Sequence, residues 1–112
     1  MVKKAVIMKG DGIGPEVVDS MINILKECNL QSELIHCEAG SEQWEQNGSK
    51  DTSYIPESTM KNLEEVDACF KGPTTTIPKP GAPRSVAVSL RQKFELFSNI
   101  RPIKTFKRLT PN

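Results

Sequence analysis

The sequence predicts an α/β fold with a mainly parallel sheet, and two observations support this fold class. Short apolar runs, typical of strands, alternate with stretches whose apolar residues recur every three or four positions, as in helices. The first apolar run leads at once into a glycine-rich turn and a proline, a typical passage from strand to helix. The length of 112 residues is enough for one small domain.

The first half of the chain is expected to form a strand, a helix, a strand and a short helix. Residues 3–9 are apolar and β-leaning, and a helix follows over 15 to about 28. Its predicted apolar face consists of Val17, Val18, Met21, Ile22, Leu25 and Cys28. Residues 32–37 are expected to form the second strand. Ser41 is expected to cap a short helix that ends at Asn47.

The second half is expected to contain two helices, one strand and a rigid loop. A helix is predicted over 56 to about 65, and a strand that is apolar on both faces over 66–71. Four prolines make the following loop, residues 72–83, unfit for regular structure. A helix is then expected over 85 to about 97, and an extended segment over 99–106. The predicted buried stripe of that helix consists of Val86, Leu90, Phe94 and Phe97.

Composition and charge exclude several classes of partner. The formal net charge is +1, so no broad attraction to nucleic acid or to a membrane surface is expected. No apolar run approaches the roughly 20 residues of a membrane span, and no targeting segment is recognised. Three cysteines and one histidine lack metal-ligand spacing, which predicts free thiols, no zinc site and a cytoplasmic location.

The stretch GDGIGPE, residues 10–16, raises the question of a nucleotide phosphate site. The dinucleotide-binding fingerprint needs glycines spaced as G-x-G-x-x-G. Here Gly10, Gly12 and Gly14 fall one residue short, and Pro15 lacks the N–H that a phosphate would accept. The spacing alone leaves two alternatives open, a weak phosphate site or a tight strand-to-helix turn without a ligand.

Hydroxyl groups and guanidinium groups form two further candidate sites. Thr74, Thr75 and Thr76 follow a predicted strand on a proline-rich loop, where their hydroxyls could bind an amide or a carboxylate; simple loop residues are the alternative. A second set consists of Arg84, Arg91 and Arg101. Guanidinium groups bind carboxylates as a bidentate fork, so this set predicts a ligand with several carboxylates. The alternative is a group of surface ion pairs, each worth under about 1 kcal/mol.

Together, GDGIGPE, KGPTTT and RSVAVSLRQKFELFSNIRP resemble the β-decarboxylating dehydrogenases, the family of isocitrate, 3-isopropylmalate and homoisocitrate dehydrogenases. The resemblance spans residues 3 to about 106 and is closest to isocitrate dehydrogenase. It implies the three-layer α/β fold of isopropylmalate dehydrogenase, which is not a Rossmann fold. It also implies that residues 1–98 are the first part of a large domain, and that 99–112 begin the crossing into a second domain.

The resemblance assigns roles residue by residue. It implies that the substrate carboxylates are bound by Ser85, Arg91 and Arg101. It implies that the cofactor site is lined by Ile13, Thr74, Thr75 and Thr76. Arg84 has no firm counterpart in the family. Ala87 matches neither the asparagine usual in isocitrate enzymes nor the leucine usual in isopropylmalate enzymes, so the substrate stays open.

The implied activity is NAD- or NADP-dependent oxidative decarboxylation of a 2-hydroxy acid, assisted by Mg²⁺ or Mn²⁺. Isocitrate, converted to 2-oxoglutarate in the tricarboxylic acid cycle, is the first expectation. 3-Isopropylmalate, from leucine biosynthesis, and homoisocitrate are the alternatives. The family forms homodimers or larger assemblies.

The family's catalytic lysine and tyrosine and its metal-binding aspartates come after the part that this chain resembles. The chain is therefore expected to be the N-terminal portion of a longer enzyme, to hold no catalytic or metal-binding residue and to be inactive alone. A non-catalytic, carboxylate-binding regulatory module is the alternative from another class.

Overall fold

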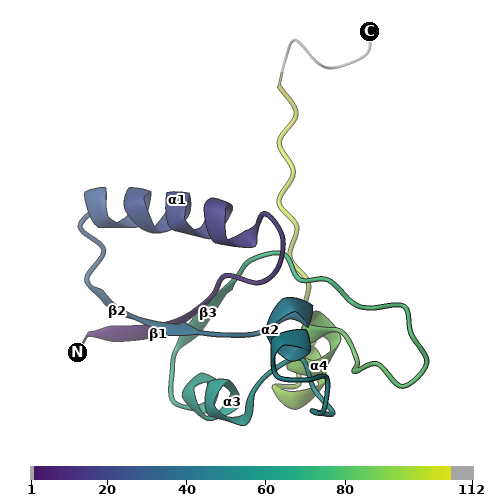
Figure 1. Cartoon of the computed structure of the whole chain (residues 1–112). Coiled ribbons are helices and arrows are strands. Elements are labelled where there is room, and N and C mark those ends of the chain that lie inside the picture. The colour runs from purple at the N-terminus through teal and green to yellow at the C-terminus, as the bar shows by residue number, and fades with distance from the viewer. Residues whose placement is uncertain (1, 107–112) are drawn as a thin grey trace, which may run out of the picture.

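The computed structural model describes residues 2–106, which form a three-stranded sheet with helices on both faces (Figure 1). The elements in chain order are β1 (Lys3–Met8), α1 (Gly14–Glu27), β2 (Ser32–Cys37), α2 (Ser41–Gln46), α3 (Glu57–Glu64), β3 (Ala68–Lys71) and α4 (Val86–Lys93). The strand order is β2-β1-β3, and both pairings are parallel. The predicted α/β class and parallel sheet are thereby confirmed.

The central strand β1 supplies the core of both faces of the sheet. Successive side chains of a strand point to opposite faces, and residues 5–8 are all buried. Ile7 packs against Val18 and Ile22 of α1 on one face. The other face is covered by a cluster of Val6, Met8, Ala39, Trp44, Tyr54, Ile55, Leu63 and Val86. Figure 1 shows the resulting layers, with α1 on one side of the sheet and α2, α3 and α4 on the other.

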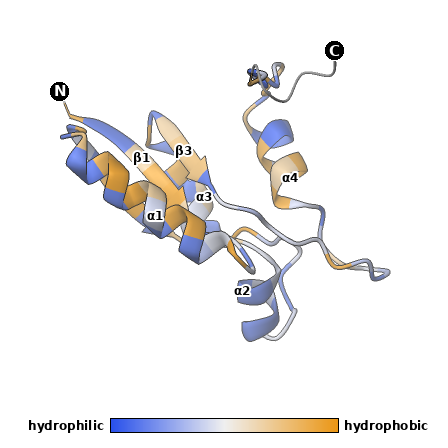
Figure 2. Cartoon of the chain, turned by 90° about the horizontal axis from the view of Figure 1, so that it is seen from above, coloured by the Kyte–Doolittle hydropathy of each residue, from blue (hydrophilic) through white to orange (hydrophobic). Residues whose placement is uncertain are grey.

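The buried face of α1 is narrower than the sequence predicts. Val18 and Ile22 are buried, but Val17 is 52% exposed and Cys28 is also exposed. The helix lies on the outside of the sheet, so only one stripe of its surface touches another layer. Figure 2 looks down on the outer side of α1, where hydrophobic residues alternate with hydrophilic ones.

Helix α4 ends four residues earlier than predicted. It stops at Lys93, and Glu95 follows with a φ of +51°, a left-handed conformation that an α-helix cannot continue through. Phe97 is consequently 100% exposed rather than part of a buried stripe. Val86 is buried as expected, while Leu90 and Phe94 are half-buried against the core.

Two smaller predictions are also wrong. Ser41 does not cap α2 with its side chain, because the cap position is Gly40, at a φ of +128°. Strand β3 begins at Ala68, later than predicted, and all its residues are exposed because it lies at an edge of the sheet. Beyond α4, the chain leaves the body of the structure as a long single segment up to residue 106 (Figure 1). The last six residues of the predicted crossing into a second domain, 107–112, lie outside the described residues.

Candidate functional site

Three loops meet at the carboxyl ends of the parallel strands. Strand β1 leads into the glycine turn, residues 9–13, and β2 leads into α2. Strand β3 leads into the segment 73–77, which we name the threonine loop. In open α/β sheets, ligands bind beyond the carboxyl ends of the strands. This edge is therefore the place to look for a ligand site.

One buried carboxylate joins the three loops. Asp11 is only 4% exposed, and its Oδ2 accepts hydrogen bonds from the backbone N–H of Ser41, at 3.0 Å, and of Thr75, at 2.6 Å. Its Oδ1 accepts from the N–H of Glu42 at 2.9 Å. The N–H of Asp11 itself donates to the Pro73 carbonyl at 2.8 Å. Hydrogen bonds to an ionised group are the stronger kind, so Asp11 fixes the threonine loop and the start of α2 together.

Sequence reasoning missed this role of Asp11. The family resemblance gave Asp11 no role, because its position does not match the family's metal-binding aspartates. The available signal was an acidic residue enclosed by glycines immediately after a buried strand, where backbone segments come close together. No sequence pattern showed that its partners would lie 30 and 64 residues further along the chain.

The glycine turn is closed by the protein's own groups. The N–H of Gly12 donates to Oε1 of Glu42 at 2.8 Å, so a donor that a phosphate would need already has a carboxylate partner. A Cβ at Gly10 would lie 2.0 Å from the Pro73 carbonyl oxygen, which no larger residue could tolerate. These contacts favour the tight structural turn over the phosphate site. Ile13, at the cap of α1, is 68% exposed and open to contact.

The threonine loop is held through its backbone at Thr75 and has two hydroxyls available. The N–H of Thr75 is bound by Asp11, and the Oγ1 of Thr74 accepts from Nζ of Lys71 at 3.3 Å. Thr75 and Thr76 are exposed, and their hydroxyls make no hydrogen bond within residues 2–106. These two hydroxyls can therefore serve a ligand without breaking an existing bond.

Two of the three predicted arginines, Arg91 and Arg101, converge on the side-chain amide of Asn99. With its oxygen turned toward the two guanidinium groups, the Asn99 side chain accepts from Nη2 of Arg91 at 2.7 Å. The same oxygen accepts from Arg101, from Nε at 3.3 Å and from Nη2 at 3.2 Å. We call Arg91, Asn99 and Arg101 the arginine cluster; all three are exposed. Two like charges held beside one neutral oxygen favour an anionic ligand that can neutralise them.

The predicted serine and the first of the predicted arginines lie at the start of α4, away from the arginine cluster. Ser85 caps this helix, because its Oγ accepts from the N–H of Val88 at 3.3 Å. Arg84 precedes the helix and donates from Nη1 to Oε1 of Gln92, so it is not part of the arginine cluster. The hydroxyl proton of Ser85 stays available, because capping uses only an oxygen lone pair.

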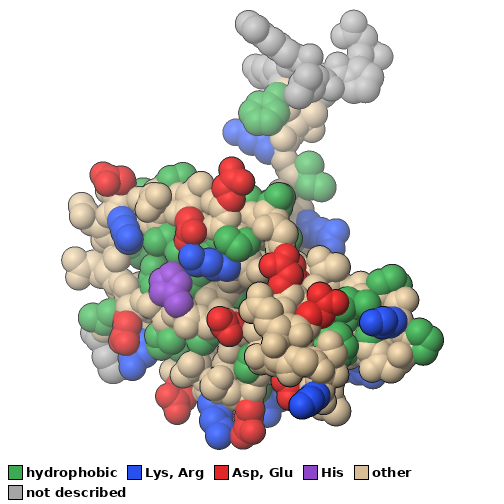
Figure 3. Space-filling view, in the orientation of Figure 1, with side chains coloured by type: hydrophobic (Ala, Val, Ile, Leu, Met, Phe, Trp, Pro, Cys, Tyr) green, Lys and Arg blue, Asp and Glu red, His purple; other side chains and the backbone are tan. Residues whose placement is uncertain are grey.

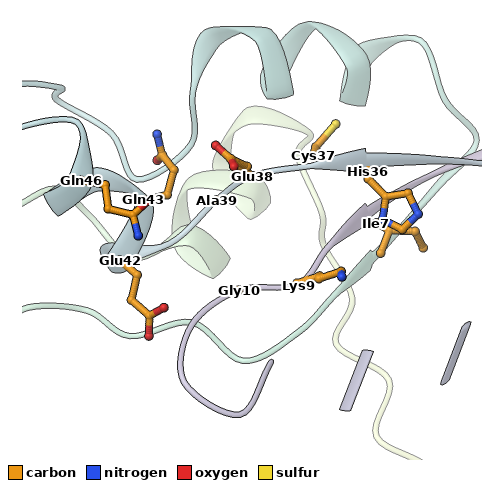
Figure 4. Close-up of a pocket in the computed structure, with 10 residues that line it drawn as sticks. All are labelled: Ile7, Lys9, Gly10, His36, Cys37, Glu38, Ala39, Glu42, Gln43 and Gln46. Carbon is orange, nitrogen blue, oxygen red and sulfur yellow. The ribbon is translucent and has the colours of Figure 1, made fainter. Parts of the chain in front are cut away.

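A polar groove of about 470 Å³ opens at the same edge of the sheet, between the ends of β1 and β2 and helix α2 (Figure 4). Lys9, His36, Glu38, Glu42 and Gln43 are among its lining residues. None of the residues predicted to bind substrate or cofactor lines it. Figure 3 shows the histidine on the surface of this face, among basic and acidic side chains.

The shifted pKa values belong to groups away from these loops. Desolvation raises the pKa of Cys69 to about 11, because the residue lines an apolar cleft between β3 and α4 although it stays partly open to solvent. A hydrogen bond of 2.9 Å between Lys3 and Asp67 lowers the pKa of the carboxyl and raises that of the amine. These shifts report strand packing rather than a reactive centre.

Within residues 2–106, no three His, Cys, Asp or Glu side chains gather closely enough to hold a metal ion. Over the same residues, the helices lack the length and apolarity that a membrane span requires.

Known proteins are similar to this chain both in sequence and in the arrangement of elements. The family model described as isocitrate/isopropylmalate dehydrogenase matches residues 4–112. Homoisocitrate dehydrogenase of Methanocaldococcus jannaschii is 38% identical over 106 residues, which is 92% of this chain and 29% of that protein. The NADP isocitrate dehydrogenase of Rickettsia bellii is 34% identical, over 95% of this chain and 22% of that protein. The 3-isopropylmalate dehydrogenase of Methanothermobacter thermautotrophicus is 33% identical, over 91% of this chain and 28% of that protein.

Solved structures give the same result. A β-decarboxylating dehydrogenase from Thermococcus kodakarensis superposes with a TM-score of 0.73 at 30% identity, covering 85% of this chain and 27% of that one. Isocitrate dehydrogenase from Methylococcus capsulatus superposes with a TM-score of 0.74 at 33% identity, covering 86% of this chain and 27% of that one. The chain thus spans less than a third of the length of these relatives.

Proposed function

Because this chain belongs to the isocitrate/isopropylmalate dehydrogenase family, we propose that it forms part of the ligand site of an NAD(P)-dependent β-decarboxylating dehydrogenase. The observation that carries the proposal is the convergence of Arg91 and Arg101 on the single oxygen of Asn99. Two guanidinium groups at one point suit a substrate with more than one carboxylate.

The proposed reaction has two stages. The C2–H of a 2-hydroxy acid is lost as hydride while the hydroxyl proton is removed, and the resulting β-keto acid loses CO₂. When bound, the nicotinamide accepts the hydride and a divalent cation stabilises the enolate left by decarboxylation. The described residues of this chain hold and orient ligands; we assign none of them to proton transfer or to metal ligation.

Each predicted residue has a place in this scheme. Arg91 and Arg101 bind the carboxylates common to the family's substrates, and the hydroxyl of Ser85 donates a hydrogen bond to the substrate's variable end. Thr74, Thr75 and Thr76 contact the cofactor, beside Ile13. The open hydroxyls of the threonine loop and the exposed surface of Ile13 support these roles.

Isocitrate is the proposed substrate, because Ser85 caps the helix that carries Arg91, nearly two turns before it, and offers a donor to a further carboxylate. The exposed Ala87 offers neither a hydrogen bond nor a large apolar surface, so homoisocitrate and 3-isopropylmalate remain the alternatives. We further propose a cytoplasmic homodimer or larger assembly for the whole protein. Either NAD or NADP is the cofactor.

The test is a substrate panel on the whole protein with Mg²⁺ and each of NAD and NADP. Isocitrate, homoisocitrate and 3-isopropylmalate are compared by kcat/KM. Arg91→Lys is expected to lower kcat/KM for the preferred acid at least tenfold, because an ammonium cannot replace the bidentate fork. Arg84→Lys is the matched control, since Arg84 donates to Gln92 outside the cluster, and it should change little.

Three outcomes are informative. A preference for 3-isopropylmalate refutes the isocitrate assignment but keeps the family reaction. Equal losses in the two arginine variants refute the role of the arginine cluster. Binding of a dicarboxylate with no turnover of any substrate favours the carboxylate-binding regulatory module instead.

A further inference from the structure

Tyr54 has no part in the proposed function, yet its hydroxyl reaches the threonine loop. Its side chain is 0% exposed, and its oxygen accepts a hydrogen bond from the N–H of Ile77 at 3.0 Å. The ring meets Trp44 edge-on, with centroids 5.5 Å apart and an interplanar angle of 79°. An aromatic ring enclosed in this way has little freedom, so its oxygen is held in one place.

The bond from Ile77 closes a circuit of hydrogen bonds. In the middle of the loop, the N–H of Thr75 donates to Asp11, and at the end of the loop, two residues later, the N–H of Ile77 donates to Tyr54. The start of α2 joins the two acceptors. There the N–H of Gly40 donates to the Tyr54 carbonyl at 2.9 Å, and the next N–H along the chain donates to Asp11 at 3.0 Å. Four segments of the chain, at residues 11, 40–41, 54 and 75–77, are thereby locked together.

We propose that Tyr54 is a positioning residue that holds the threonine loop ready for its ligand. This inference rests on the proposed function, in which Thr75 and Thr76 contact the cofactor. A loop anchored at Thr75 and again at Ile77 has little freedom left between the two points. Ligand binding then does not have to order it, and the hydroxyls of Thr75 and Thr76 remain in place for contact.

The first experiment measures the anchor without any ligand. Tyr54→Phe removes only the hydroxyl. Amide hydrogen exchange at Ile77, followed by NMR in the 112-residue chain, is expected to become about fivefold to tenfold faster, as the loss of one buried hydrogen bond predicts. Thr59→Val is the matched control. It removes another buried hydroxyl, 2% exposed, that donates to the Glu38 carbonyl at 2.8 Å, and it should leave Ile77 unchanged.

The second experiment measures the consequence in the whole protein. Tyr54→Phe is expected to raise the KM of the nicotinamide cofactor about threefold to tenfold with little change in kcat, because the free loop must be ordered on binding. Thr59→Val should change neither constant. A raised KM with an unchanged kcat indicates a positioning role, because a general loss of stability would lower the amount of active protein and hence the apparent kcat.

Two results overturn the inference while the proposed function stands. One is equal exchange at Ile77 in the wild-type and Tyr54→Phe chains. The other is an active protein whose cofactor KM is the same with and without the hydroxyl. A wild-type protein that turns over no acid of the panel refutes the proposed function and the role of Tyr54 in it, while the exchange result still decides the anchor.

Discussion

The threonine loop and the arginine cluster are the two halves of the proposed ligand site, and the protein holds them in opposite ways. The loop is fixed through its backbone by Asp11, which is 4% exposed. The cluster is held through side chains alone, by the exposed Asn99. The proposed cofactor side is therefore built into the folded core of this chain, while the proposed substrate side depends on contacts that solvent can compete for.

The surroundings of the cluster strengthen the contrast. Phe97 and Ile100, on either side of Asn99, are 100% and 84% exposed. Single exposed apolar side chains are common on protein surfaces, but several large ones close together in the chain are unusual. Because these side chains bury almost no surface, the segment after α4 contributes little to the stability of the described fold. Mutations in the threonine loop's anchors and in the arginine cluster should therefore have different effects on stability.

The largest expected effect is that of Asp11→Ala. It leaves three backbone N–H groups at a buried junction without their acceptor, those of Ser41, Glu42 and Thr75. The free energy of unfolding should fall by about 3 kcal/mol or more. Urea unfolding of the chain, followed by Trp44 fluorescence, measures it. Asp19→Ala is the control, since its exposed ion pair with Lys9 should contribute under about 1 kcal/mol. Similar losses in the two variants would remove the distinction between core and surface.

The next largest effect is expected at Gly40, where the backbone of the segment before α2 passes close to Asp11. Gly40 has a φ of +128°, and a Cβ there would lie 2.4 Å from Oδ1 of Asp11. Gly40→Ala is expected to destabilise the fold by about 2 kcal/mol or more, from backbone strain and the displaced carboxylate. Gly81→Ala is the matched control, with a φ of +81° and nothing within 4 Å, and should cost about 1 kcal/mol. The difference between the two variants reports the contact with Asp11 together with the greater backbone strain at Gly40, whose φ is +128° and ψ 178°, and equal losses would contradict both.

Asn99→Ala tests the other half of the site. The free energy of unfolding should change by less than about 0.5 kcal/mol, because the residue is exposed. In the whole protein, the KM of the hydroxy acid should rise about threefold to tenfold, since Arg91 and Arg101 lose the group that brings them together. Urea unfolding measures the change in stability, and steady-state kinetics of the whole protein measure the change in KM. A large loss of stability would show that the cluster belongs to the core after all.

The smallest effect comes from an exposed carboxylate that also binds a backbone N–H. Asp67 accepts from Lys3 at 2.9 Å and from the N–H of Lys4 at 3.2 Å, and its pKa is lowered. A lowered pKa stabilises the folded state above the unfolded pKa of about 3.9, and this stabilisation is lost as pH falls through the folded value. Asp67→Asn should therefore lower Tm slightly at pH 7, and the difference should vanish at low pH. If the two proteins still differ in Tm at low pH, the stabilisation by Asp67 does not come from its charge.

The parts of the fold that could be predicted are those with local signals. The periodicity of residues 15–28 and the proline-rich loop 72–83 carry their own information, and the structure agrees with both. The end of α4 and the exposure of Phe97 could not be predicted, because they depend on which surfaces another layer covers. Pattern alone shows that a residue is apolar, not that a partner exists for it.

The candidate site likewise contains residues that the sequence predicts and residues that it does not. The arginines were found from side-chain chemistry, and the structure brings Arg91 and Arg101 together, although their binding roles stay a prediction. Asp11 and Tyr54 were missed because their partners are backbone N–H groups. Every residue except proline carries such a group, so these partners leave no trace in the sequence.

The bond between Asp11 and Thr75 also bears on the order in which the chain folds. Ser41 meets the same carboxylate across 30 residues, but Thr75 does so across 64, which costs about 0.7 kcal/mol more in loop-closure entropy. On a ribosome, the aspartate and the start of α2 are made well before the threonine loop is. The last bond at this junction therefore marks completion of the sheet, and it should form on the native side of the folding transition state.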